Sequence, residues 1–227
     1  MDTLKRYWPL LVAVILYIIY ALTGIYVSRA AIIVFLMFWC LYLIFRHASK
    51  DSRKKFIFVP LAFLFSIFGD LCLHLDSNYP KYEAIIFIVG VALYFIAHVW
   101  YICFTLREGK INKLLLSILA VVFIVYFIFL LYPNISNNGI RVAVMLYILV
   151  SCVSVSSAAA MPYGPDMDKT AKVLTVCGIS SLLFSDFLIS LHDFVGIPTG
   201  YSLMLPTFYL SQILVTGALI HLLDKRK

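Results

Sequence analysis

Apolar residues run through this sequence almost end to end, in stretches of about 20 residues separated by short polar segments. A helix of about 20 apolar residues crosses the roughly 30 Å of hydrocarbon in a bilayer. Only 13% of the 227 residues are charged, against about 25% in a typical soluble domain. The sequence therefore predicts an all-α, polytopic membrane protein that forms a single transmembrane domain over residues 1–227.

Proline, glycine, asparagine and clusters of charge divide the chain into eight predicted spans. The first apolar run follows Lys5 and Arg6, as the core of a secretory signal would. It is too long for a signal core and leads almost at once into a second apolar run, so we interpret it as a membrane helix. The predicted spans are approximately 7–24, 30–46, 56–75, 84–106, 113–132, 139–161, 170–191 and 202–223.

Lysine and arginine are strongly segregated between the two sets of loops. Only Arg29, Lys81 and Arg141 fall on one side of the predicted membrane, and all other Lys and Arg residues fall on the side of the termini. Positively charged loops are retained in the cytoplasm, so both termini are predicted to be cytoplasmic. This placement also explains the net charge of +7 through contact with membrane lipids, and no nucleic-acid partner is expected. We expect a bacterial cytoplasmic (inner) membrane.

Sequence motifs for metal, nucleotide and serine-hydrolase chemistry are absent. The five cysteines lie inside apolar segments without C-x-x-C spacing, which is typical of small buried side chains. There is no H-E-x-x-H run, P-loop or G-x-S-x-G motif. The sequence therefore predicts no metal and no cofactor.

Two carboxylates lie inside predicted spans, Asp70 in the third and Asp186 in the seventh. At a rise of about 1.5 Å per residue, each lies roughly 20–24 Å from the cytoplasmic end of its helix, in the outer half of the membrane. Their surroundings are alike, since residues 68–70 are Phe-Gly-Asp and residues 184–186 are Phe-Ser-Asp, which fits a four-helix duplication. Because carboxylates inside membranes mark functional sites, we predict that the two share one site.

Other polar residues fall at a related depth. Tyr209 is predicted at the level of the two acids, with Tyr94 and Gln212 near the middle of the membrane, and these side chains could line one cavity. His98 lies deeper and is predicted to be a partner behind them. A lone histidine on a helix is equally compatible with a structural role.

A polar stripe follows one face of the third span. Ser66, Asp70 and His74 recur at four-residue intervals, which places them on the same side of a helix. They are predicted to lead out of the membrane.

Small residues in the sixth and seventh spans predict that these two helices pack closely, because small side chains let membrane helices approach. They are Ser151, Ser154, Ser157 and Ala158 in the sixth span and Gly178, Ser181 and Ser185 in the seventh.

In order and spacing, several short motifs resemble the YhhN-like family of lysoplasmalogenase membrane proteins. The motifs are Gly69-Asp70-Leu71, residues 90–95 with Ala97-His98 and Tyr101, Ser185-Asp186, and Tyr209 with Gln212. The resemblance implies that a lysophospholipid is the substrate. It implies hydrolysis of the vinyl ether bond of a lysoplasmalogen, giving a fatty aldehyde and glycerophosphoethanolamine or glycerophosphocholine.

Two carboxylates suit this chemistry. A protonated acid can deliver a proton to the alkene carbon, while its ionised partner stabilises the resulting cation or activates water. We predict that Asp70 and Asp186 are this catalytic pair. The predicted substrate-binding or orienting residues are Tyr94, His98, Tyr209, Gln212, Ser66 and His74.

Two alternatives fit the same residues. In a transporter or an ion or proton carrier, the paired acids would bind a cation or relay protons. In a structural or regulatory membrane protein they would only hydrogen-bond neighbouring helices, which contributes about 0.6 kcal/mol on average.

Overall fold

Long helices make up most of the computed structural model, which describes residues 4–23, 26–75, 80–107, 109–161, 168–198 and 201–225. Short helical segments, α3 (Lys50–Phe56), η2 (Pro80–Tyr82), η3 (Phe127–Leu131) and α7 (Tyr132–Asn134), join the long ones. The predicted all-α class is confirmed. The eight long helices of the described chain are α1 (Leu4–Thr23), α2 (Tyr26–His47), α4 (Phe58–Leu75), α5 (Glu83–Leu106), α6 (Lys113–Tyr126), α8 (Asn138–Ala159), α9 (Lys169–Val195) and α10 (Tyr201–Lys225).

Seven helices in the described parts of the chain are long and apolar enough to cross a membrane. The chain is therefore an integral, multi-pass membrane protein. The predicted span at 30–46 coincides with α2, whose described apolar part, Ala31–His47, is shorter than the other seven. Seven of the eight predicted spans coincide with these candidate helices, and the span at 30–46 stays a prediction.

Two helices differ from their predicted ends for local reasons. Helix α9 continues past residue 191 to Val195 and ends at Gly196, whose φ of 72° lies in the left-handed region that favours glycine. Helix α6 passes into the π-helical segment η3 at Phe127 before α7 completes the span. Such segments inside α-helices often occur at functional sites, and hydrophobicity alone does not reveal them.

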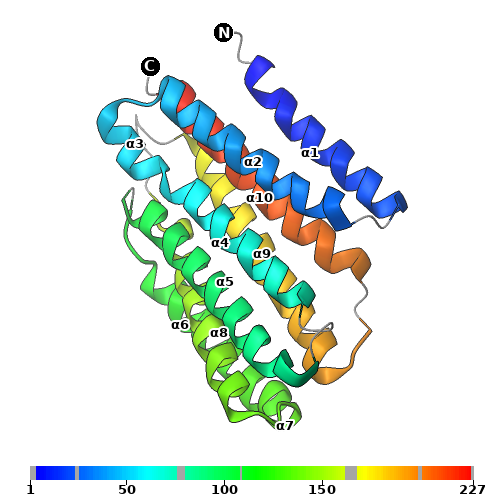
Figure 1. The fold of residues 1–227 in the computed structure, drawn as a ribbon. Coiled ribbons are helices and arrows are strands. Elements are labelled where there is room, and N and C mark those ends of the chain that lie inside the picture. The colour runs from blue at the N-terminus through cyan, green and yellow to red at the C-terminus, as the bar shows by residue number, and fades with distance from the viewer. Residues whose placement is uncertain are drawn as a thin grey trace.

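Both ends of the chain lie on the same side of the bundle (Figure 1). The guanidinium of Arg6, in α1, is bonded to the carboxylate of Asp224, near the end of α10. His221 Nδ1 lies 3.9 Å from Oδ2 of Asp168, just before α9, so α9 begins at this side too. The face with both termini is the one on which most lysines and arginines were predicted to gather.

The predicted packing of α8 on α9 is confirmed, although three of the small residues on these helices contact other helices. A Cβ added at Gly178 of α9 would lie 3.1 Å from the backbone oxygen of Ser211, so α9 approaches α10 there. Ser185 also donates a hydrogen bond to a backbone oxygen of α10. In α8, Ser157 Oγ lies 2.7 Å from Thr105 Oγ1 of α5. Helices α8 and α9 do pack on each other, but these three small residues face other helices.

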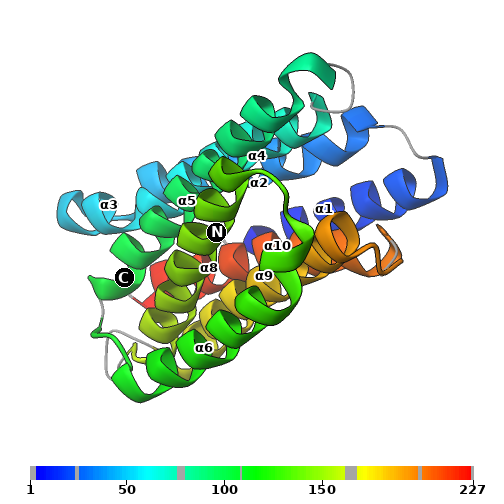
Figure 2. The ribbon, with the colours of Figure 1, turned by 90° about the horizontal axis from the view of Figure 1, so that it is seen from below.

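Helices α1 and α6 lie at opposite edges of the bundle, as the two views show (Figures 1 and 2). Helix α1 packs on α2 and α10, whereas α6 packs on α8. The most extensive contacts join α9 to α10, α4 to α5, and α5 to α8. The candidate site lies on the α6 side, where α5, α8 and α9 meet.

Candidate functional site

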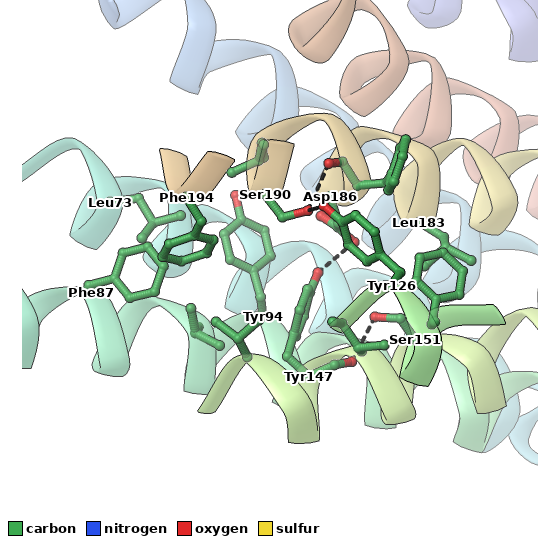
Figure 3. Close-up of a pocket in the computed structure, with 16 residues that line it drawn as sticks. Leu73, Phe87, Tyr94, Tyr126, Tyr147, Ser151, Leu183, Asp186, Ser190 and Phe194 are labelled. Atoms are coloured by element: carbon green, nitrogen blue, oxygen red, sulfur yellow. Dashed lines mark hydrogen bonds between the residues drawn. The ribbon is translucent and has the colours of Figure 1, made fainter. Parts of the chain in front are cut away.

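An apolar pocket opens among α5, α6, α8 and α9, with one residue from α4 (Figure 3). Its volume is about 640 Å³ when the open space at its mouth is included. Most of its sixteen lining residues are aliphatic or phenylalanine side chains. The lining residues with polar groups are Tyr94, Tyr126, Tyr147, Ser151, Asp186 and Ser190.

Asp186 is the only carboxylate among the residues that line this pocket. Helix α9 places it opposite α8, whose Tyr147 donates a hydrogen bond of 2.6 Å from its hydroxyl to Oδ2 of Asp186. His98 of α5 brings its Nε2 to 3.6 Å from the same oxygen. With only 13% of its side chain exposed, the carboxylate is held in a fixed position by groups from two other helices.

The hydrogen bonds around His98 show which of its nitrogens carries a proton. Nε2 lies 3.2 Å from the hydroxyl of Tyr147 and 3.2 Å from that of Ser151. Tyr147 gives its one hydroxyl proton to Asp186, and Ser151 gives its own to the backbone oxygen of Tyr147. Both hydroxyls therefore have only lone pairs left for His98, so Nε2 must be the donor.

Gln212, a predicted orienting residue, is connected to this group from behind. Its Oε1 accepts a hydrogen bond of 3.0 Å from the hydroxyl of Tyr101, and the ring of Tyr101 packs edge-on against that of His98 at 6.3 Å. Gln212 is fully buried and is not among the pocket-lining residues. It supports the α5 side of the site without facing the pocket.

Asp70, the other predicted catalytic residue, is 5% exposed and is not among the residues that line the pocket. The residue before it, Gly69, lies against Tyr94, since a Cβ added at Gly69 would be 2.7 Å from Cδ2 of that ring. Tyr94 also lines the pocket of Asp186. One side chain thus lies between the helix segment that carries Asp70 and the pocket, and a direct pairing of the two carboxylates stays a prediction.

The remaining predicted residues lie outside the pocket lining. Tyr209 is buried and packs against the ring of Tyr17 at 5.5 Å. Along the predicted polar stripe of α4, Ser66 is buried and His74 is exposed. Burial thus decreases along this stripe in the direction of the helix end.

In both α4 and α9, the small residue before the acid contacts the next long helix of the chain. In α4 the small residue before the acid, Gly69, packs against the next helix, α5. In α9 the small residue before the acid, Ser185, donates a hydrogen bond to the next helix, α10.

Sequence reasoning missed Tyr147, and it treated Ser151 only as a small packing residue. Both lie on α8, four residues apart and thus on one face of the helix. A tyrosine hydroxyl in the interior of a predicted span was the available signal, because a polar group there needs a partner. The hydrogen bond of 2.7 Å between Tyr126 and Ser190, at the α6 side of the pocket, was also not predicted.

This arrangement is suited to acid–base chemistry on an amphiphilic molecule. Asp186 and Tyr147 place a carboxyl and a hydroxyl at one wall of a mostly apolar pocket, and the ring of His98 lies behind that wall. In the described residues, no group of three or more His, Cys, Asp or Glu side chains has the arrangement of a metal site.

Comparisons with curated proteins and with solved structures found no match. The sequence profile of the YhhN family matches residues 24–219, which include every pocket residue described above. Because this match covers most of the chain, the protein belongs to the YhhN family.

Proposed function

We propose that this protein is a membrane-embedded hydrolase that cleaves the vinyl ether bond of lysoplasmalogens. The products would be a fatty aldehyde and glycerophosphoethanolamine or glycerophosphocholine. The YhhN family includes lysoplasmalogenases. The observation that carries the proposal is Asp186, held by Tyr147 inside an apolar pocket of a membrane protein.

The pocket matches the two-part character of such a substrate. Its apolar walls suit a hydrocarbon chain, and its polar groups gather around Asp186, where the ether oxygen and glycerol would lie. No cofactor is needed, since the reaction consumes only water.

The proposed reaction begins with transfer of a proton to the alkene carbon that is not bonded to oxygen. This gives an oxocarbenium-like cation, and water then adds to the carbon next to the oxygen. The resulting hemiacetal loses its glycerol oxygen as an alcohol and becomes the aldehyde. One water is consumed, and the acid regains its proton.

Asp70 and Asp186 are proposed to divide this work as acid and as stabiliser of the cation or activator of water. Asp186 faces the pocket, and Asp70 would act from the far side of Tyr94. His98 and Tyr147 would hold Asp186 and orient the attacking water. Gln212 would act through Tyr101, as the contacts described above suggest.

Tyr209, Ser66 and His74 are proposed to support the substrate on the side of α4 and α10. Both termini are proposed to be cytoplasmic, in a bacterial inner membrane. Asp186 would then lie in the half of the bilayer away from the cytoplasm, because it is about 26 Å along α9 from Lys169.

The test is aldehyde release from a purified lysoplasmalogen in detergent, with Asp186→Asn and Asp70→Asn as variants. Each is expected to abolish release while the protein still elutes as a folded species. Asp193→Asn is the matched control, because this acid is on the same helix as Asp186 but is 38% exposed and does not line the pocket. Full activity of either buried-acid variant would refute the role of that acid.

A transporter would behave differently. It would move a cation or lipid across proteoliposomes and would release no aldehyde from any lysoplasmalogen. That result would replace the proposed hydrolase with a carrier.

A further inference from the structure

A second hollow lies between α6 and α9, beside the pocket of Asp186. Three of its lining residues do not also line the pocket of Asp186, namely Val122 of α6 and Ser180 and Phe184 of α9. Its volume is about 680 Å³ counted to its open side. We call it the α6–α9 groove.

The groove adjoins the pocket of Asp186. Four side chains line both hollows, namely Phe123, Tyr126, Leu183 and Phe187. An elongated molecule in the groove would therefore reach Asp186 by passing this shared wall.

The open side of the groove faces the lipid. Val122 is 56% exposed and Phe184 is 48% exposed, and both are apolar. The helical stretch that contains α6 is the most apolar and the least buried of the seven candidate spans. In a membrane this surface meets hydrocarbon chains, so the occupant of the groove must be apolar along its length.

Side chains rather than backbone close the space between these two helices. Helix α6 packs on α8, and the neighbouring segment in close backbone contact with α9 is η3. Next to η3, at the end of α6, the ring of Phe187 packs against the rings of Phe123 and Tyr126, at centroid distances of 6.4 and 5.0 Å. The hydrogen bond between Tyr126 and Ser190 spans the same gap. Aromatic side chains rather than backbone therefore separate the groove from the pocket.

The groove also has a direction relative to the membrane. Along α9, Ser180 is about 16 Å and Asp186 about 26 Å from Lys169, near the side of the termini. A chain in the groove would point its free end toward the middle of the membrane and its other end toward Asp186. This is how a lipid of the leaflet opposite the termini is oriented.

We propose that the α6–α9 groove binds the hydrocarbon chain of a single-chain phospholipid, with the glycerol end of the chain at Asp186. The lining of the groove comes from two helices, α6 and α9, and the proposal places one chain between them. The identity of this lipid as a lysoplasmalogen rests on the proposed function, whereas the position of its chain rests on the groove.

Two neighbouring valines provide the test. Val122→Trp fills the groove, whereas Val121→Trp places the same ring on the same helix turned away from the groove lining, at a residue that is 63% exposed. The probe is an acyl lysophosphatidylethanolamine with a diazirine near the end of its chain, photolysed with the protein in nanodiscs. Crosslinked peptides are identified by mass spectrometry, and aldehyde release from a lysoplasmalogen is measured in parallel.

We expect crosslinks on α6 and α9 around the groove in the wild type and in Val121→Trp. In Val122→Trp this labelling and kcat/KM should both fall roughly 5–150-fold, the range expected when an occupied packing site is overfilled. A two-chain phosphatidylethanolamine should compete with the probe less well than an unlabelled lysolipid.

The outcomes separate the two proposals. Three results would refute the proposal that the groove binds a lipid chain. They are crosslinks spread evenly around the bundle, equal labelling of both variants, and equal competition by the two-chain lipid. Aldehyde release that Val122→Trp leaves unchanged would also overturn it, while the hydrolase would stand. Crosslinks in the groove of a protein that releases no aldehyde would support the chain site and refute the hydrolase.

Discussion

Replacement of Tyr147 by phenylalanine removes one oxygen atom at the centre of the candidate site. This hydroxyl donates to Oδ2 of Asp186 at 2.6 Å and lies 3.2 Å from Nε2 of His98. The phenylalanine ring keeps the packing against His98, whose ring centroid is 5.3 Å away. Tyr147→Phe is therefore a test of the hydroxyl alone.

Two magnitudes distinguish a functional hydroxyl from a structural one. A hydrogen bond to a charged group is worth about 1.5–3 kcal/mol, which corresponds to about a 10–150-fold change in rate if the bond positions Asp186 during the reaction. A hydrogen bond between membrane helices contributes only about 0.6 kcal/mol to stability on average. We therefore expect a large loss of kcat/KM with a small change in thermal stability.

Aldehyde release is measured with a coupled alcohol dehydrogenase, and unfolding is followed in the same detergent. Tyr42→Phe is the control, because this tyrosine is 43% exposed on α2, outside the pocket. If Tyr147→Phe keeps more than about half of the wild-type kcat/KM, the hydroxyl contributes under about 0.5 kcal/mol. The proposed role of Tyr147 in positioning Asp186 would then be wrong.

Three further predictions follow from the packing and the topology. Gly69→Ala should lower thermal stability and aldehyde release together, because the added Cβ would lie 2.7 Å from the ring of Tyr94. Gly217→Ala is the control and should alter neither, because its added Cβ would lie 3.5 Å from the nearest atom. Asp224→Asn should cost about 2–3 kcal/mol of stability, since it leaves the charge of buried Arg6 unpaired while Asp224 itself is partly exposed. Thermal unfolding would show this loss, and unchanged activity per folded molecule would confirm that the pair is remote from the site. A fluorescent protein fused to the C-terminus should fluoresce and a phosphatase fused there should be inactive, and the opposite pattern would refute a cytoplasmic C-terminus.

The sequence predicts the helices well because the hydrocarbon core imposes a length on them. It predicts Asp186 as a site residue for a similar reason, since a carboxylate in hydrocarbon is costly and needs partners. Those partners were harder to predict. A tyrosine such as Tyr147 has a ring that suits an apolar helix, and its hydroxyl shows its role only when the facing helix is known.

The packing of α8 on α9 was predicted correctly, but the partners of individual small residues were not evident, for a related reason. In a soluble bundle the polar face of a helix marks the side that faces water, but here lipid-facing and buried side chains are both apolar. Gly178 and Ser157 were correctly identified as contact residues, yet they face α10 and α5 rather than each other. Which helix a small residue contacts depends on how all the helices of the bundle are placed. The residues around it in the sequence do not show that placement.

The bond between Arg6 and Asp224 has a consequence for biosynthesis. Ribosomes add about 5–20 residues per second, so on the order of 10–40 s pass between the synthesis of Arg6 and the synthesis of Asp224. During that interval the first helix must stay next to the translocation machinery or the lipid headgroups with its cation unsatisfied. A nascent chain that stops before its last helix would keep this charge exposed, which gives membrane quality control a chemical mark of an unfinished protein.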